Sequence, residues 1–322
     1  MIKYYVAPME GLTGYLWRPI HNRIFGGADR YYTPFVSPNA TCKFQTKELD
    51  ELQHNEGLPV VPQILTNCAE HFLWAAREMA EMGYGEVNFN LGCPSGTVTA
   101  KRKGAGALFY PDELQRMLDE IFAQLPRGVA VSVKTRIGKE SPDEWARLLD
   151  IYNRYPIAEL IVHTRVQKEF YRGHARREMV GDILGSTALR VCYNGDLFSP
   201  EDMSAMERDY PQLNALMMGR GLVTDPALLR RARGGAPATR EELRQFHDEL
   251  FAAYLQRMSG DLNAIYRMRE LWNYLAGSFV DAEDFLKKMR KSKNRGEYLA
   301  AVERLFGENE LNPCPQPPPG KK

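Results

Sequence analysis

The chain has 322 residues, of which 44% are hydrophobic and 26% are charged. This length and composition predict a folded protein with one large domain and a smaller one, and they exclude a chain that is disordered throughout. Lysine and arginine number 42 against 41 acidic residues, so no overall positive field would attract nucleic acid, and any basic surface must be local.

The start of the sequence and its cysteines exclude further classes. The chain opens without the apolar stretch of a signal peptide, and no later run reaches the ~18 apolar residues of a membrane span. We therefore expect a cytoplasmic protein without membrane contact and without an obligate protein partner. The five cysteines are odd in number and form no Cys-x-x-Cys pair, which argues against a disulfide scaffold and against a metal site.

Eight short β-rich segments recur through the first two thirds of the chain, each followed by helical spacing or a helix-start signal. They are predicted at residues 4–9, 31–37, 59–65, 86–91, 129–136, 159–164, 190–195 and 215–220. Such alternation is typical of parallel βα units, which form either a closed (β/α)₈ barrel or an open doubly wound sheet. We predict the barrel, that is, a TIM barrel of the α/β class.

The strand rhythm ends near Pro237, and the sequence after it favours helices. Thr239 and Glu242 form a predicted capping box at the start of a helical segment. We therefore predict a barrel domain at 1–236, an all-helical domain at 237–306 and a proline-rich, disordered tail at 307–322.

Polar and reactive side chains gather at the carboxyl ends of the predicted strands, which is where barrels build their active sites. The ends carry Pro8 and Met9, Ser37, Gln63, Asn90 with Cys93, Lys134 with Arg136, His163 with Arg165, Asn194 to Asp196, and Gly219 to Gly221. Each residue alone could be structural, but their common phase along the eight strands predicts one site.

The last two strand ends are rich in glycine. Backbone amides at Gly195 and Gly219 can approach an anion closely, and Arg220 can add a charge-assisted hydrogen bond, which together resemble a barrel phosphate site. Two ordinary turns remain the alternative. Lys134 could form a Schiff base, an ion pair, or a contact with an electron-rich ring whose reduced form is anionic.

A mononucleotide cofactor such as FMN fits this pattern, because no dinucleotide glycine fingerprint follows the first strand. Gln63 and His163 could then bond the polar edge of the flavin ring. Cys93 lies just past the fourth strand, and an unperturbed thiol is mostly protonated at neutral pH, which suits a proton donor. A nucleophilic dyad with His163 and a merely structural role stay open for this cysteine.

Seven motifs at the strand ends form a series. They are Ala7-Pro8-Met9-Glu10-Gly11, Gln63-Ile64-Leu65, Asn90-Leu91-Gly92-Cys93-Pro94, Val133-Lys134-Thr135-Arg136, His163-Thr164-Arg165, Asn194-Gly195-Asp196 and Met218-Gly219-Arg220-Gly221. With them the chain resembles the tRNA-dihydrouridine synthase family, flavoproteins that reduce uridine in tRNA to 5,6-dihydrouridine. Gly14 and Asn88 stand where this family often has an acidic residue, which leaves the modified uridine open.

The resemblance implies a site and a mechanism. FMN would be held by Pro8, Met9, Gln63, Lys134, His163, Asn194, Gly195, Gly219 and Arg220. Asn90 and Arg136 would face the uracil or the flavin edge. NADPH would reduce the flavin, hydride would pass to C6 of the uracil, and Cys93 would protonate C5. The enzyme would thus be an NAD(P)H-dependent oxidoreductase acting on tRNA.

Binding of RNA requires local positive charge, and basic residues cluster in three runs. The run 287–295 has six basic residues and no acid, and it falls in the predicted helical domain. We expect its Lys287, Lys288, Arg290 and Lys291 to contact the RNA backbone, together with Lys101 and Arg102 from the loop after Cys93. A solvated helix face is the alternative.

Three other functions stay open from the residues alone. An FMN-dependent barrel oxidoreductase could act on a small unsaturated substrate. A Schiff-base lyase could use Lys134 and bind a phosphorylated sugar at Arg220, but it leaves Cys93 unexplained. An RNA-binding protein without catalysis would not need the full set of strand-end residues.

Overall fold

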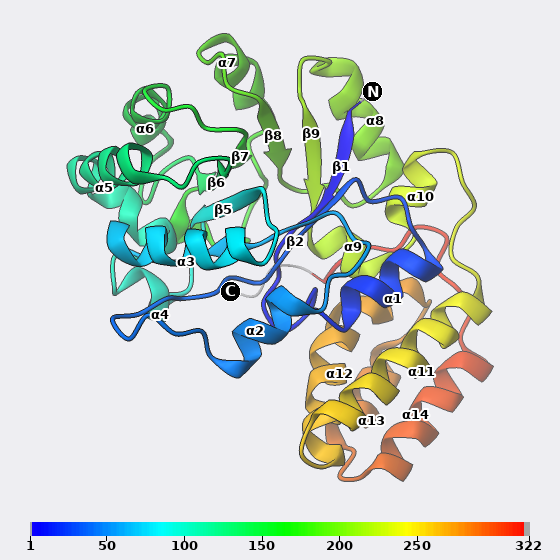
Figure 1. The fold of residues 1–322 in the computed structure, drawn as a ribbon. Helices are drawn as coiled ribbons and strands as arrows, with labels where there is room; N and C mark the ends of the chain where they lie inside the picture. The colour runs from blue at the N-terminus through cyan, green and yellow to red at the C-terminus, as the bar shows by residue number, and fades with distance from the viewer. Residues whose placement is uncertain (1, 319–322) are drawn as a thin grey trace.

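The computed structural model describes residues 2–318 and consists of a parallel β-barrel with a helical domain against one side (Figure 1). The strands are β1 (Lys3–Val6), β2 (Arg30–Tyr32), β3 (Val60–Val61), β4 (Gln63–Ile64), β5 (Glu86–Leu91), β6 (Ala130–Arg136), β7 (Leu160–His163), β8 (Val191–Asn194) and β9 (Ala215–Met218). Each of the eight predicted segments overlaps one of these strands or, at 59–65, two. The predicted TIM barrel is confirmed.

Pro62 explains why nine strands make an eight-stranded barrel. The sheet order is β3-β2-β1-β9-β8-β7-β6-β5-β4, and the two outermost strands are the halves of one segment that Pro62 interrupts. Proline has no N–H to donate to a ladder, so the strand pairs with β2 before this residue and with β5 after it. The two edges of the sheet therefore meet in a single segment, and the barrel closes.

Helices surround the barrel as the alternating pattern predicts. They are α1 (Trp17–Ile24), α2 (Thr46–Gln53), α3 (Ala69–Glu81), α4 (Gly96–Thr99), α5 (Pro111–Gln124), α6 (Trp145–Tyr152), α7 (Met179–Gly185), α8 (Pro200–Asp209), α9 (Arg220–Thr224) and α10 (Leu228–Ala232), with 3₁₀ turns at Gly104–Phe109, Pro142–Glu144 and Gln167–Glu169. No helix among the described residues combines the length and the apolarity that crossing a membrane requires.

The helical domain contains α11 (Arg240–Arg257), α12 (Asp261–Leu275), α13 (Glu283–Lys291) and α14 (Arg295–Glu308). Its first helix begins at the predicted capping box, where the Thr239 hydroxyl accepts a hydrogen bond from the Glu242 amide. Phe246 of α11 packs edge-on against Trp17 of α1 and against Phe25 just after that helix, and Ser278 donates to the Thr224 carbonyl at 2.6 Å. These contacts fix the helical domain beside the carboxyl ends of the strands (Figure 1).

The chain after 306 differs from the predicted disordered tail. Helix α14 continues to Glu308, Leu311 pairs with Phe279 in an antiparallel bridge, and the Asn312 amide donates to the Ser278 carbonyl at 2.8 Å. This pairing with 278–280 orders a segment whose proline content alone suggested disorder. Residues 319–322 lie outside the described residues, so the prediction is not tested there.

Candidate active site

A cavity of about 310 Å³ opens at the carboxyl ends of the strands. It is lined by all nine residues predicted to hold the cofactor, which are Pro8, Met9, Gln63, Lys134, His163, Asn194, Gly195, Gly219 and Arg220. Asn90, Cys93 and Arg136 line the same cavity, and Tyr274 of α12 reaches it from the helical domain. The barrel therefore brings the predicted residues together, while their individual roles stay predictions.

Side-chain amides form a hydrogen-bonded chain on one wall of the cavity. Asn90 donates to the Gln63 amide oxygen at 2.7 Å, Gln63 donates to Asn88 at 2.7 Å, and Asn88 donates to the Ser132 hydroxyl at 2.9 Å. All four side chains are buried, so these bonds remove the cost of burying unpaired amides. Asn88 both accepts and donates here, which an ionised carboxylate at this position could not do.

Asn90 also positions the loop that carries the cysteine. Its amide oxygen accepts hydrogen bonds from the backbone N–H of Gly92 at 3.1 Å and of Cys93 at 2.9 Å. Gly104 adopts a φ of +55° and lies so close that an added Cβ would be 2.9 Å from the Cys93 carbonyl oxygen. The backbone of Cys93 is thus held from two sides at the mouth of the barrel.

The surroundings of Cys93 favour its protonated form. Burial raises the pKa of this thiol, and Glu10 acts in the same direction, while the Ser95 amide and the charges of Arg136 and Lys134 oppose them only in part. The thiol therefore keeps its proton at neutral pH. This direction agrees with the predicted proton donor and disfavours a thiolate nucleophile.

Lys134 on β6 is directed at Asn194 on β8, with 2.8 Å between its ammonium nitrogen and the amide oxygen. Burial, and next the charge of Arg136, lower the pKa of Lys134 to about 8. Asn194 in turn donates to the Met217 carbonyl at 2.8 Å. The ammonium is therefore held in place without a carboxylate partner among the described residues.

His163 at the end of β7 is neutral. Burial, followed by the charges of Arg136, Lys134, Arg165 and Arg220, lowers the pKa of its imidazole well below the usual value. Its Nε2 lies 3.2 Å from Nη1 of Arg165. Because a guanidinium only donates, Nε2 must accept, and the imidazole proton sits on Nδ1, which leaves the ring one hydrogen-bond donor.

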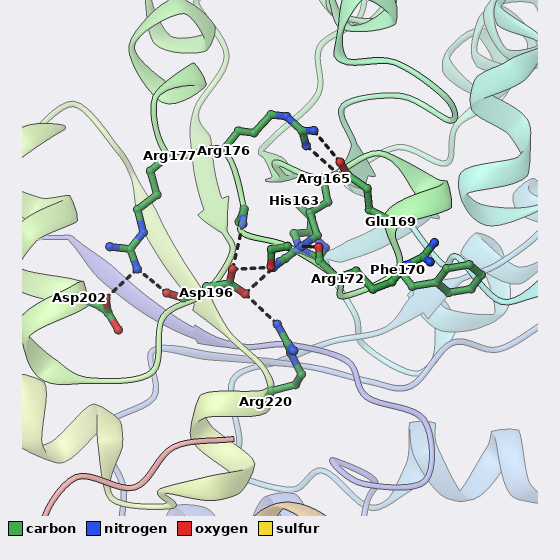
Figure 2. Close-up of polar contacts among 12 residues, drawn as sticks. His163, Arg165, Glu169, Phe170, Arg172, Arg176, Arg177, Asp196, Asp202 and Arg220 are labelled. Carbon is green, nitrogen blue, oxygen red and sulfur yellow. Dashed lines mark hydrogen bonds and ion pairs between the residues drawn. The ribbon is translucent and has the colours of Figure 1, made fainter. Parts of the chain in front are cut away.

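Asp196 is the centre of an arginine cluster beside the cavity (Figure 2). Arg165 binds it with both Nη atoms, at 2.9 and 2.6 Å, and Arg220 donates to it at 2.8 Å. Burial acts to raise the pKa of Asp196, but these arginines and the Ala175 amide outweigh it and lower the pKa. Arg177 completes the cluster, donating to the Asp196 carbonyl and to the carboxylate of Asp202.

Gly219 borders the cavity at a crowded point, where an added side chain would press against two other lining residues. A Cβ added at Gly219 would lie 3.2 Å from the sulfur of Met9 and 3.4 Å from the Cβ of Ala7. At Gly195 an added Cβ would lie 2.2 Å from the Tyr193 hydroxyl, so the position of the Tyr193 side chain requires glycine there. Both turns border the cavity next to Arg220.

Arg136, which was predicted to face the uracil or the flavin edge, has backbone partners in this structure. Its guanidinium donates to the carbonyls of Gly92 at 3.0 Å, Val166 at 3.0 Å and Phe170 at 2.9 Å. These bonds join the cysteine loop to the loop after β7. Arg136 still lines the cavity, but in this structure its donors hold the backbone of two loops.

The predicted RNA-contacting residues lie away from the cavity. Lys287, Lys288, Arg290 and Lys291 are exposed on α13. Lys101 and Arg102 are exposed between α4 and the turn Gly104–Phe109, and Arg102 pairs with Glu113 at 2.8 Å. None of the six lines the cavity, so any contact with a substrate occurs outside it.

Four aromatic residues line the cavity that were not predicted from the sequence, namely Phe35, Tyr171, Phe198 and Tyr274. Tyr171 in the loop after β7 lies with its ring centroid 4.6 Å from the guanidinium carbon of Arg220 and 6.1 Å from the His163 ring. Tyr274 belongs to α12. Neither tyrosine follows a strand end directly, and no periodic signal in the sequence distinguishes them from other tyrosines.

Two known proteins are similar to this chain over most of its length. A synthase from Neisseria meningitidis serogroup B, named tRNA-dihydrouridine(16) synthase, is 26% identical over 93% of this chain and 94% of its own length. A probable tRNA-dihydrouridine synthase 2 from Bacillus subtilis is 26% identical, covering 93% of each chain.

Solved structures agree with the barrel fold. Histamine dehydrogenase from Rhizobium sp. 4-9 superposes with a TM-score of 0.54 at 10% identity, covering 77% of this chain and 49% of that one. A variant of NCR from Zymomonas mobilis has a TM-score of 0.50 at 13% identity, covering 76% and 90%. The family model described as dihydrouridine synthase matches residues 5–309, and the chain therefore belongs to the dihydrouridine synthase family.

Proposed function

We propose that this protein is a cytoplasmic oxidoreductase that reduces specific uridines of tRNA to 5,6-dihydrouridine, with FMN as bound cofactor and NADPH as reductant. One observation carries the proposal: a protonated thiol, Cys93, borders the same cavity as two cations without carboxylate partners in the described chain, Lys134 and Arg136. The thiol suits proton donation, and the two cations suit an anionic ligand. Membership of the family supports tRNA as the substrate.

The residues around the cavity fit FMN. Lys134, the Nδ1–H of His163 and the Gln63 amide line this cavity and would supply hydrogen-bond donors to the polar edge of a flavin ring. The backbone turn at Gly219 and the guanidinium of Arg220 would suit the phosphate, whose negative charge would balance a cluster in which two arginines share Asp196. Pro8, Met9, Asn194 and Gly195 complete the lining.

The reaction requires a hydride at C6 and a proton at C5 of the uracil. Bound FMN, once reduced, supplies the hydride. Cys93 Sγ holds the proton and delivers it to C5, and the nearby charges of Arg136 and Lys134 stabilise the thiolate that remains. Asn90 positions the thiol through its two backbone contacts. Water or a solvent acid then returns the proton to Sγ.

The exposed basic residues on α13 provide the proposed contact with the RNA backbone. Lys287, Lys288, Arg290 and Lys291 lie on one helix of the domain that also supplies Tyr274 to the cavity. Phosphates bound along this helix would place the rest of a tRNA across the mouth of the barrel. The similarity to relatives named for position 16 makes uridine 16 the first position to examine.

The test begins with the absorption spectrum of the purified protein and the mass of the released cofactor. We expect flavin bands, loss of these bands on adding NADPH, and their return with unmodified tRNA, with dihydrouridine counted by mass spectrometry of the digested RNA. Arg220→Ala should retain FMN less well. A colourless protein that does not bind FMN, or a reduced flavin that only a small enone reoxidises, would contradict the proposal.

A further inference from the structure

Three neighbouring loops at the mouth of the barrel expose aromatic rings next to lysines. Phe109 ends the turn after Cys93 and is 50% exposed, and Phe170 lies in the loop after β7 and is 40% exposed. Lys139 follows β6, and Lys168 precedes Phe170. We call these four residues, Phe109, Lys139, Lys168 and Phe170, the aromatic rim.

The loops that carry the aromatic rim contact one another. The Lys139 ammonium lies 3.8 Å from the centroid of the Phe109 ring. The carbonyl of Lys139 accepts a hydrogen bond from the Lys168 amide at 3.2 Å, and the Phe170 amide donates to Gln167 at 3.0 Å. The Gln167 side chain donates to the Pro94 carbonyl at 3.1 Å, which ties the aromatic rim to the loop of the proton donor.

Phe170 has a strained backbone that its neighbours impose. Its φ is 51° and its ψ is −97°, a conformation that costs a bulky residue roughly 1–3 kcal/mol. Arg136 holds the Phe170 carbonyl at 2.9 Å, and Arg165 holds the carbonyls of Arg172 at 3.2 Å and Gly173 at 2.7 Å. Figure 2 shows the Phe170 ring directed away from the arginine cluster, so the strain keeps an apolar ring outside the protein core.

We infer that the aromatic rim stacks with tRNA bases that flank the uridine in the cavity, while Lys139 and Lys168 contact phosphates. The inference rests on the proposed function. A uridine that enters the cavity must leave the base stack of its loop, and an exposed ring can replace the stacking that its neighbours lose. Glu140 lies 3.8 Å from Lys139 and 3.7 Å from Lys168, and the three residues together keep one positive charge.

The position and the charge favour RNA over a protein partner. The aromatic rim follows the strands β5, β6 and β7 whose ends line the cavity, so it is placed to contact a substrate too large for the cavity. A cation above a ring leaves the exposed ring able to stack with a planar base, because stacking requires only one face.

The test measures tRNA affinity for Phe109→Ala and Phe170→Gly, with an unmodified tRNA transcript as the probe. We expect affinity to fall about 5- to 100-fold for each, as for the loss of one stacked base, with an unchanged dependence on salt. Lys139→Gln with Lys168→Gln should instead flatten the salt dependence. Phe170→Gly should melt at or above the temperature of the parent, because glycine accepts a positive φ, and it should retain FMN.

Met82→Ala is the matched control, since Met82 is an exposed apolar residue, at 38%, beyond the end of α3 and before β5 begins, at the opposite end of the barrel. Parent-like tRNA affinity in both phenylalanine variants would overturn the inference, as would an equal loss of affinity for a blunt RNA duplex. If the parent forms dihydrouridine, such results reject the aromatic rim alone. A parent that neither binds tRNA nor forms dihydrouridine would reject the proposed function as well.

Discussion

The ammonium nitrogen of Lys134 and the amide oxygen of Asn194 lie 2.8 Å apart and join strands β6 and β8 across the intervening β7. Asn194 contributes a neutral oxygen, so the pair places a cation in the cavity without cancelling its charge. The cost appears in the pKa of Lys134, which burial lowers to about 8. An anion bound beside the ammonium would raise the pKa of Lys134 again. If that anion is a reduced flavin ring, the interaction also changes the midpoint potential of the flavin.

Lys134→Met should make FMN harder to reduce. The ammonium stabilises a reduced, anionic ring, so its loss should lower the midpoint potential by roughly 30–60 mV, equivalent to one charged hydrogen bond. Because Lys134 loses its proton above about pH 8, the potential of the parent should fall with an additional slope from that pH upward, and the variant should lack this slope. Spectroelectrochemical titration at several pH values measures both effects.

The sign of the matching stability effect follows from the same pKa. The folded protein binds the Lys134 proton less tightly than the unfolded chain does, so the charged lysine lowers the free energy of unfolding. This destabilisation is complete below about pH 8 and disappears as the pH rises toward the ordinary pKa of lysine. Apo-protein should therefore gain stability from this residue as the pH rises above 8. A chemical denaturation series in which parent and Lys134→Met respond alike would contradict this.

Cys93→Ala should separate the two half-reactions. Reduction of the flavin by NADPH does not use the thiol and should stay near the parent rate. Dihydrouridine formation should fall by about 10²- to 10⁴-fold, the effect of losing a general acid. Stopped-flow reoxidation by unmodified tRNA, followed by mass spectrometry of the digested RNA, measures this. Cys93→Ser should recover little, because a hydroxyl is a much weaker acid, and a parent-like yield in the alanine variant would assign the proton to another group.

Asp196→Asn should destabilise the protein more than a surface carboxylate does. It would leave Arg165, which is 1% exposed, without its counter-charge, a change that costs about 3–5 kcal/mol for buried pairs. Asp150→Asn is the control, because Asp150 pairs with Arg154 where both side chains are mostly exposed, at 75% and 53%. Thermal melts compare the two, and FMN should offset part of the loss in Asp196→Asn by binding Arg220.

Replacing Lys287, Lys288 and Lys291 with glutamine should weaken tRNA binding and reduce its dependence on salt, by about one unit of slope for each phosphate that a lysine no longer neutralises. The flavin spectrum should not change. Arg127→Gln with Arg154→Gln serves as the control, since both residues are exposed on the barrel away from α13. If the lysine variant binds tRNA with the affinity and the salt slope of the parent, the basic run 287–295 is only a solvated helix face.

Local patterns made much of this molecule predictable. A strand such as Glu86–Leu91 is found at its predicted bounds, because the β-formers Val87 and Phe89 alternate in it and the strand breakers Gly92 and Pro94 follow. The barrel rule then placed Gln63, Lys134 and His163 at one cavity, since strands in parallel register end on the same side. Neither step required knowledge of distant contacts.

Features that depend on distant contacts were not predictable. Tyr171 reaches the cavity because Arg136 and Arg165 fix the backbone of its loop, and Tyr274 reaches it because α12 packs beside α9. Arg136 itself follows a strand end like a ligand-binding residue, yet its donors hold three carbonyls. Leu311 is ordered by a bridge to Phe279 that no local signal indicates.

The environment of Cys93 also bears on its chemical durability. Oxidants and alkylating agents attack thiolates far faster than thiols, so a raised pKa slows both reactions at neutral pH. Cys93 lines an open cavity, and its protonated state therefore protects it from oxidation and alkylation. We expect iodoacetamide to modify Cys93 slowly until the pH is raised, and the cysteine to remain reduced over many turnovers.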